Sequence, residues 1–131
     1  MMNKNLFKST RVMILTSLLM LSATSVSGEE LYTVTEGNIL DSETYRGFIL
    51  HRNMCARCHG SYGQGMIGPN LADSLNKLSK EEFNDVVTNG RMAMPPWKSN
   101  AEVMAGLDNL YAYFKARADG AIGEVRPKKA E

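Results

Sequence analysis

The stretch Cys55-Ala56-Arg57-Cys58-His59 decides the fold of this chain. Two cysteines stand three positions apart, and a histidine follows the second one directly. Residues three positions apart on a helix project from the same side. If the stretch is helical, both sulfurs face one partner and the imidazole of His59 is carried next to them. Such a turn can hold a flat group by one edge and offer a nitrogen ligand to its centre.

Several chemistries use paired cysteines, but only one of them requires the adjacent histidine. A structural zinc site needs four ligands, and beyond these three the chain offers only His51. A thioredoxin-type redox pair needs a βαβ context, and the sequence pattern predicts no strand before the motif. A disulfide suits an exported chain but does not require His59. C-x-x-C-H is the attachment motif for c-type haem, with both sulfurs bonded to the porphyrin and the histidine beneath the iron. We therefore interpret Cys55–His59 as a haem-attachment motif, with a disulfide or a metal site as the alternatives.

The N-terminal residues are typical of a secretory signal peptide. Lys4, Lys8 and Arg11 make a positive start, Val12–Leu21 is apolar, and small residues fill Ser22–Gly28. The apolar block is shorter than the roughly 20 residues that a membrane-spanning helix needs. We therefore predict export with cleavage, and an uncleaved N-terminal anchor is the alternative.

Cleavage after Ser27 or Gly28 divides the chain into a signal peptide, residues 1–28, and one monohaem domain, residues 29–131. Without its three N-terminal cations, the domain keeps 12 of the chain's 15 basic residues against all 14 acidic ones, a net charge near −2. Nucleic-acid binding calls for a clustered basic face, so this balance argues against a nucleic-acid partner. No later apolar run could span a membrane. The sequence predicts an exported domain in the periplasm.

Three segments of the domain carry helical signals, and loops rich in glycine or proline separate them. The helices are expected over residues 42–58, 79–89 and 101–120, and the loops over residues 60–71 and 91–99. The clearest start is the capping box of Ser79 and Glu82, whose side chains can each accept from the other's backbone N–H. Residues 29–40 are expected to form an extended lead-in, and the basic tail 126–129 to be solvated. The domain is therefore predicted to be all-α.

The order of these pieces resembles the class I cytochromes c over about residues 42–120. The matching motifs are Cys55–His59, Gly68-Pro69-Asn70-Leu71, Met94-Pro95 and Leu110-Tyr-Ala-Tyr113. The resemblance implies a class I cytochrome c fold, in which the N- and C-terminal helices cross around one covalently bound haem c.

Two positions before the motif bear on this helix crossing. Gly47 stands eight residues before Cys55, where the family uses glycine so that the two helices approach closely. His51 stands four residues before Cys55, where the family usually has an aromatic residue. Three aromatic residues of the last helix are expected to pack against Gly47 and Phe48. They are Tyr111, Tyr113 and Phe114.

His59 and Met94 are the expected axial ligands of the iron. Two prolines follow Met94, and prolines stiffen a loop, so that its side chains are held in place. A soft, neutral thioether favours ferrous iron and raises the reduction potential. Met92, two residues earlier, is the alternative sulfur. The resemblance also implies that Pro69 presents its carbonyl oxygen to the second ring nitrogen of His59.

The other candidate ligands are poorly placed to reach the face of the haem opposite His59. Met66 is in the glycine-rich loop, close to the attachment point, and His51 is about two turns before His59 on the same helix. We interpret His51 as a surface or helix-interface residue. Trp97 either packs near the haem or is an ordinary buried aromatic residue.

With both axial positions filled, the predicted function is electron transfer, and the protein is predicted not to be an enzyme. A haem enzyme or gas sensor needs an open distal site with a polar donor or base, and this is the alternative from a different class. A detached domain of a larger haem complex is a further alternative.

The stretches Met94–Trp97 and Leu107–Gly120 resemble a particular group, the small periplasmic cytochromes c that accept electrons from pyrroloquinoline-quinone alcohol dehydrogenases. This resemblance implies a quinoprotein methanol or ethanol dehydrogenase as the electron donor, and a terminal cytochrome oxidase or another cytochrome as the acceptor. A generic periplasmic shuttle of another respiratory chain is the alternative. Docking is expected at the exposed haem edge, around residues 55–58, 63–68 and 94–97.

Overall fold

The computed structural model describes residues 30–131 of the 131-residue chain. The predicted signal peptide and its cleavage site lie outside the described residues, so they stay predictions. Between residues 30 and 131, no helix is long and apolar enough to cross a membrane.

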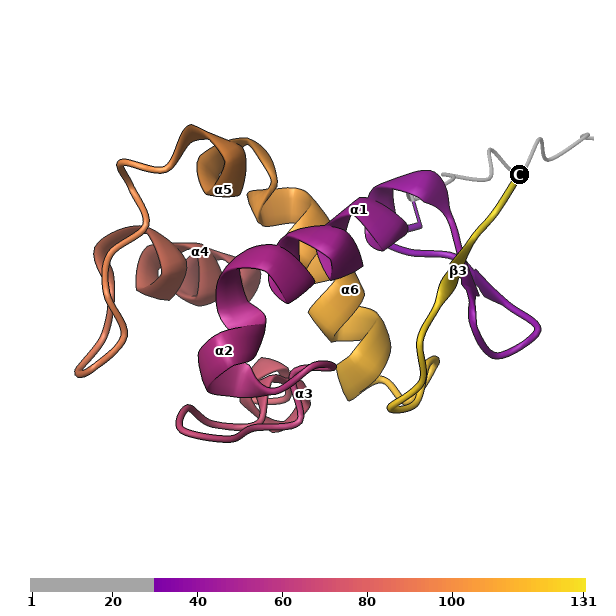
Figure 1. Ribbon diagram of the computed structural model, residues 1–131, viewed down its shortest axis with the longest axis horizontal. Helices are drawn as coiled ribbons and strands as arrows, with labels where there is room; N and C mark the ends of the chain where they lie inside the picture. Colours follow the sequence, from indigo (N-terminus) through magenta and orange to yellow (C-terminus); the bar gives the residue numbers. More distant parts are fainter. Residues whose placement is uncertain (1–29) are drawn as a thin grey trace, which may run out of the picture.

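The described part contains six α-helices, one π-helical turn and three very short strands (Figure 1). In chain order they are β1 (Val34–Thr35), β2 (Ile39–Leu40), α1 (Ser42–Leu50), η1 (His51–Cys55), α2 (Ala56–His59), α3 (Leu71–Leu75), α4 (Lys80–Asn89), α5 (Ala101–Ala105), α6 (Leu107–Ala118) and β3 (Lys128–Lys129). The helices form the body of the molecule, as the sequence predicts. The short helix α3 is not predicted, and it begins at Leu71, the last residue of the predicted loop 60–71.

α1, η1 and α2 follow one another directly and together form the predicted first helix. Asp41 caps the start, because its carboxylate accepts hydrogen bonds from the backbone N–H of Glu43 at 3.0 Å and of Thr44 at 2.9 Å. The predicted start is confirmed, and the helix ends at His59, one residue beyond the predicted end.

The π-helical turn η1 comes just before the motif and is not predicted by the sequence pattern. In it, the backbone N–H of Ala56 donates to the carbonyl of His51, five residues back. Such a turn holds one more residue than an α-helical turn and is frequent at functional sites. The extra residue rotates everything that follows, so η1 helps to set the direction in which Cys58 and His59 face.

α1 crosses α6 near the middle of the molecule (Figure 1), and Gly47 lies at the crossing. A Cβ atom at Gly47 would overlap the backbone carbonyl oxygen of Asn109 on α6. Only glycine permits this approach, so the predicted close crossing is confirmed. Beside it, the rings of Phe48 and Tyr113 meet edge to face with their centroids 5.5 Å apart.

The aromatic residues of α6 are divided between two neighbours, although all three are predicted to pack against α1. Tyr113 packs on Phe48, as expected. Tyr111 instead lies against Phe83 of α4 at 5.6 Å between centroids, and Phe114 is 6.3 Å from the same ring. The prediction is wrong for Tyr111 because successive residues of a helix project about 100° apart, so the helix buries side chains against α1 and α4 at once.

α4 begins with the predicted capping box. The backbone N–H of Ser79 donates to the Glu82 carboxylate at 2.8 Å, and the N–H of Glu82 donates to the Ser79 hydroxyl at 3.2 Å. The helix stops at Asn89, and Gly90 follows with a φ of 77°. Both predicted ends are confirmed, and the buried face of α4 carries Phe83 and Val87.

The predicted helix from Ala101 to Gly120 is in fact two helices, α5 and α6. Asn100 caps the first, accepting from the N–H of Val103 at 3.0 Å. The helix breaks at Gly106, where a Cβ atom would overlap the Leu50 side chain of α1. The single-helix prediction is wrong because α1 passes so close to Gly106 that the backbone takes a non-helical conformation there, with φ −105° and ψ 13°.

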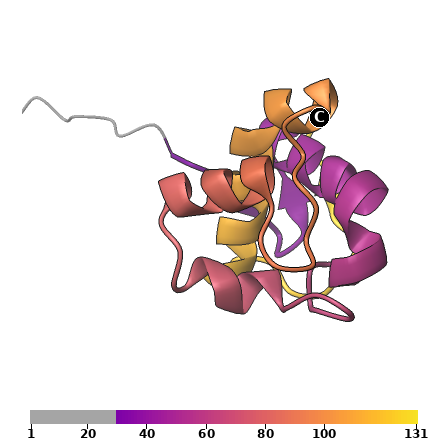
Figure 2. The same cartoon turned by 90° about the vertical axis from the view of Figure 1, so that its left-hand side faces the viewer.

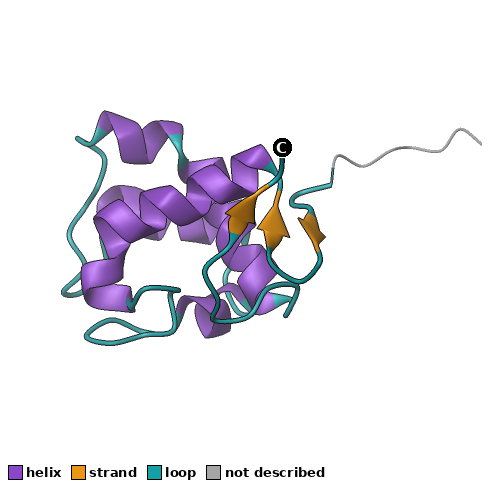
Figure 3. Cartoon of the chain, turned by 45° about the vertical axis from the view of Figure 1, so that its right-hand side comes forward, coloured by secondary structure: helices purple, strands orange, loops and turns teal. Residues whose placement is uncertain are grey.

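Both chain ends of the described part meet in a small sheet at the side of the helical body (Figure 3). β1 pairs antiparallel with β2, and β3 pairs parallel with β2. The backbone N–H of Lys128 donates to the carbonyl of Asn38, and that of Ala130 to the carbonyl of Leu40, both at 2.8 Å. The Lys128 and Lys129 side chains of the tail are exposed, as predicted, but the backbone of the tail is hydrogen-bonded in the sheet. The sequence does not predict this strand, because a strand of two residues leaves no detectable alternation of polar and apolar residues.

Candidate haem-binding site

The two cysteines lie at the end of η1 and in α2, with Cys55 half-buried and Cys58 exposed. Both are free thiols, not joined in a disulfide. Burial, together with the neighbouring Cys58, raises the pKa of Cys55 to about 11. Thiol–disulfide enzymes depend on a cysteine of lowered pKa, so this environment argues against a thioredoxin-type redox pair. Both sulfurs remain available for thioether bonds.

His59 closes α2 and is buried, with 7% of its surface exposed. Its Nδ1 atom lies 2.9 Å from the carbonyl oxygen of Pro69. A carbonyl can only accept, so Nδ1 carries the proton and donates. The lone pair of the neutral ring is therefore on Nε2, which is the form of imidazole that binds a metal ion.

The loop of residues 60–70, here called the proximal loop, wraps around the His59 ring. The backbone N–H of Gly65 donates to the carbonyl of His59 at 2.8 Å, and that of Gly68 to the carbonyl of Cys58 at 2.7 Å. A Cβ atom at Gly68 would lie only 2.6 Å from Cε1 of His59. The backbone at Gly68 is thus packed directly against the imidazole, which fixes the plane of the ring.

The second loop of the site, residues 91–97, is called the methionine loop, and it lies on the side that Figure 2 turns toward the viewer. Met94 in this loop is half-buried and packs against the hydrophobic core. The backbone N–H of Trp97 donates to the carbonyl of Val87 at 3.1 Å. A Cβ atom at Gly90 would lie 2.6 Å from the Met94 carbonyl oxygen. The loop is therefore pressed against the end of α4, with Trp97 half-buried against the same core.

Met92 differs from Met94 in almost every respect. Its surface is 99% exposed, and its backbone has a φ of 54°, in the left-handed region that a residue other than glycine seldom adopts. The sequence offers both methionines as ligands, but the structure turns only Met94 toward the interior.

His51 lies in the interface between η1 and α6, where it also contacts the first residue of the proximal loop. It is fully buried, and its ring meets the Phe114 ring edge to face at 5.0 Å between centroids. Nε2 donates to the carbonyl of Gly60 at 2.8 Å, whereas Nδ1 has no hydrogen-bond partner. Burial lowers the pKa of His51 to about 4. Of the two interpretations of His51, the helix-interface one is confirmed, and the surface one is wrong.

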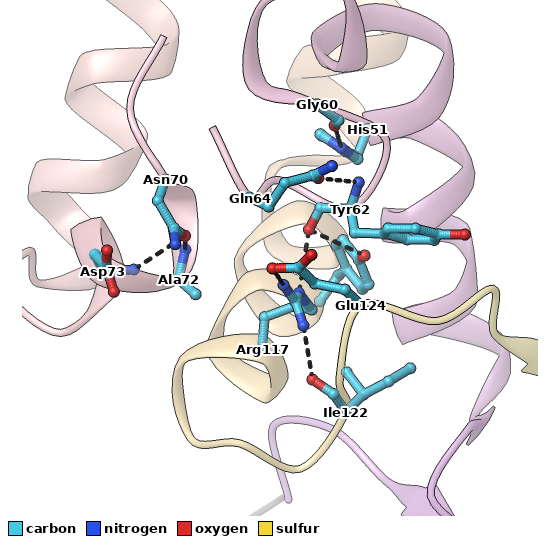
Figure 4. A network of polar contacts seen from close by, with 11 residues as sticks. His51, Gly60, Tyr62, Gln64, Asn70, Ala72, Asp73, Arg117, Ile122 and Glu124 are labelled. Carbon is cyan, nitrogen blue, oxygen red and sulfur yellow. Dashed lines mark hydrogen bonds and ion pairs between the residues drawn. The ribbon is translucent and has the colours of Figure 1, made fainter. Parts of the chain in front are cut away.

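Arg117 is part of the site's surroundings but was not found by sequence reasoning. It lies in the last turn of α6, and its guanidinium donates to the backbone carbonyls of Tyr62 in the proximal loop and of Ile122, which follows α6 (Figure 4). The one signal in the sequence is its position between Ala116 and Ala118 on a helix with a buried face. In the described part of the chain, no three His, Cys, Asp or Glu side chains gather as a metal site.

Comparison with known proteins gives a consistent result. The family model described as cytochrome C oxidase, cbb3-type, subunit III matches residues 43–114, more than half of the chain. Cytochrome c-555 of Methylococcus capsulatus is 46% identical over 85 residues, which cover 63% of this chain and 69% of that protein.

Solved structures show the same similarity in three dimensions. The c-type cytochrome XoxG from Methylobacterium extorquens AM1 superposes with a TM-score of 0.72 at 37% identity, covering 76% of this chain and 67% of XoxG. Cytochrome CL from the marine methylotrophic bacterium Methylophaga aminisulfidivorans shares the fold, with a TM-score of 0.51 at 18% identity over 68% of this chain and 69% of that one.

The residues present fit a haem c. Two free cysteines stand at the required spacing, and the adjacent histidine keeps Nε2 free because Nδ1 is engaged by Pro69. Met94 supplies a half-buried sulfur from a different loop. The set therefore offers two attachment points and two candidate axial donors, one of nitrogen and one of sulfur.

Proposed function

This chain belongs to the cytochrome c family, and from that premise we propose that it is a periplasmic electron carrier whose iron is held by His59 and Met94. The chain carries one covalent haem c. Because it has two cysteines, Cys55 and Cys58 are the attachment points. When bound, the haem supplies a one-electron couple between ferric and ferrous iron.

The observation that carries the proposal is the locked tautomer of His59. Its Nδ1 proton is held by the Pro69 carbonyl oxygen at 2.9 Å, so the lone pair of the neutral ring stays on Nε2 for a metal ion. A hydrogen bond of this kind also makes the imidazole a stronger donor to the metal. The proximal loop thus orients the nitrogen ligand before the iron changes oxidation state.

Exposure supports Met94 as the sulfur ligand. Met66 and Met92 are 65% and 99% exposed, so either would have to reorganise and lose rotamer freedom on binding iron. Met94 is already half-buried on a loop pinned to α4. A sulfur ligand would fill the second axial position and favour the ferrous state.

A filled coordination shell points to a carrier and away from an enzyme. Catalysis at a haem needs a polar donor or base beside an open iron position. The one histidine other than His59 is His51, which is buried between helices and hydrogen-bonded to Gly60. We therefore assign no catalytic residue.

We propose a quinoprotein alcohol dehydrogenase as the electron donor. The resemblance of the methionine loop and the last helix to cytochromes with that role supports this donor. The acceptor in this proposal is a terminal oxidase or another cytochrome. The expected signal peptide at residues 1–28 supports a periplasmic location.

Both loops offer exposed apolar side chains to such partners. Met66 and Ile67 of the proximal loop are 65% and 82% exposed, and Met92 of the methionine loop is 99% exposed. Redox encounters are small, below about 1,200 Å², so a few exposed apolar side chains suffice and let the partners separate again.

Substitution of the methionines tests the axial ligands. In Met94→Ala, the reduced haem is expected to bind carbon monoxide, because a small side chain leaves the iron position open. Met92→Ala, two residues away on the same loop, is the matched control and should leave the absorption spectrum unchanged. If Met92→Ala opened the site and Met94→Ala did not, the assignment of the sulfur ligand would be reversed.

Rapid mixing with a purified quinoprotein alcohol dehydrogenase from the same cell tests the partner. Reduction should be fast, and slower at high salt if charge steers docking. Ile67→Ser should slow the reduction severalfold. Val125→Ser, at an exposed apolar residue near the C-terminus, should not. Slow reduction that is insensitive to salt would count against this donor and favour the generic shuttle.

A further inference from the structure

Arg117 is a buried, permanently charged side chain behind the proximal loop. Only 6% of the side chain is exposed. Nε donates to the carbonyl oxygen of Tyr62 at 3.1 Å, and Nη1 to that of Ile122 at 3.0 Å. Figure 4 shows the guanidinium between these two carbonyls. Arginine is not deprotonated in proteins, so this position carries a positive charge at every working pH.

The charge of Arg117 is only partly balanced. Its ion-pair partner in the described part of the chain is Glu124, with 3.6 Å between Nη2 and Oε1. The Glu124 side chain is 57% exposed, so water weakens its effect on the guanidinium. A net positive field therefore remains inside the protein at this point.

This field reaches the surroundings of the haem attachment. Tyr62 follows His59 by three residues, so their Cα atoms are at most about 11 Å apart. Burial raises the pKa of Tyr113 to about 12, and the charge of Arg117 opposes that rise. Burial lowers the pKa of His51, and the charge of Arg117 adds to the effect. Tyr113 donates to the Tyr62 carbonyl at 3.5 Å and His51 to the Gly60 carbonyl at 2.8 Å, both in the loop that directly follows His59.

We propose that Arg117 raises the reduction potential of the haem through its buried charge. Reduction adds one electron and lowers the charge of the iron site by one. A fixed positive charge nearby destabilises the ferric form more than the ferrous form, because a like charge interacts less favourably with the higher positive charge. The inference rests on the proposed function as an electron carrier, for which this potential decides the direction of transfer.

A purely structural role for Arg117 predicts the opposite sign. If its main task were to tether the proximal loop, losing it would loosen the Pro69 contact with His59, weaken the imidazole as a donor and raise the potential. The loop, however, has its own backbone bonds, such as Leu71 N–H to the Gly63 carbonyl at 2.7 Å. The direction in which the reduction potential changes when Arg117 is lost therefore distinguishes the two roles.

The experiment is a spectroscopically monitored redox titration of the haem-loaded protein and its variants at one pH and ionic strength. Arg117→Gln should lower the midpoint potential, and Arg117→Lys, which keeps the charge, should stay near wild type. Arg126→Gln removes an exposed cation of the tail and should shift the potential much less. An unchanged or raised potential in Arg117→Gln would overturn the proposal, as would an equal fall in Arg117→Lys.

A second variant keeps the test decisive if Arg117→Gln does not accumulate as folded protein. Glu124→Gln removes the counter-charge and should raise the potential, and a fall or no change would overturn the proposal. Carbon monoxide binding by the wild type would refute the His59/Met94 ligation but not this inference, because a midpoint potential can be compared for any axial ligand pair.

Discussion

The Nδ1 atom of His59 and the carbonyl oxygen of Pro69 lie 2.9 Å apart, and this contact joins the haem-attachment motif to a loop residue ten positions later. It fixes the tautomer of the ring, while the backbone at Gly68 presses on its edge. The nitrogen ligand that we propose is thus oriented by the chain itself, through two neighbouring residues of the proximal loop.

Gly68→Ala should displace the His59 ring, because the new Cβ atom would lie 2.6 Å from Cε1. We expect the bond to Pro69 to lengthen and the slowly exchanging Nδ1 proton to disappear from the NMR spectrum of the reduced protein. Gly123→Ala is the control, since a Cβ atom there meets nothing within 4 Å. An undisturbed Nδ1 proton in Gly68→Ala would show that the ring is not held as described.

Gly47→Ala should destabilise the fold by about 3 kcal/mol or more, because the added Cβ overlaps backbone of α6, which cannot move without separating the helices. Gly106→Ala, whose Cβ would meet the flexible end of the Leu50 side chain, should cost about 1 kcal/mol. Denaturant unfolding of the two haem-loaded variants measures the difference. Equal losses of unfolding free energy in the two variants would mean that the crossing of α1 and α6 accommodates a Cβ atom at Gly47, contrary to this packing.

His51 should make stability depend on pH in the acid range. Its pKa is about 4 in the folded protein against 6.5 ordinarily, so between these values the unfolded chain binds more protons. The contribution is complete above pH 6.5 and is lost as the pH falls toward 4, about 3 kcal/mol in all. Denaturant unfolding at a series of pH values would show this slope.

His51→Phe should flatten that pH dependence, since phenylalanine keeps the aromatic packing on Phe114 but does not titrate. The variant should be slightly less stable at pH 7, because the Gly60 carbonyl loses its donor. Parallel stability curves for His51→Phe and the wild type would assign the acid sensitivity to other groups.

Much of the fold follows from local chemistry that a sequence displays. The capping box of Ser79 and Glu82 depends on residues close together in the chain and is confirmed, as are the predicted helix start at residue 42 and the predicted helix end at residue 89. The close approach at Gly47 needed the resemblance to cytochromes c as well, because nothing local distinguishes a crossing glycine from any other.

What the sequence does not predict depends on contacts between distant residues. The break at Gly106 arises because α1 passes close to it, and the strand at Lys128 exists only because Asn38 accepts its hydrogen bond. The role of Arg117 likewise depends on the Tyr62 carbonyl, 55 residues earlier. No periodicity or motif records such pairings.

The central claim, that both axial positions of the iron are filled, is tested most directly by adding carbon monoxide to the reduced, haem-loaded wild-type protein and recording its absorption spectrum. We predict a low-spin spectrum that carbon monoxide does not change, as expected when His59 and Met94 hold the iron. Ready binding of carbon monoxide would contradict this and place the protein among haem sensors or enzymes with an open distal site.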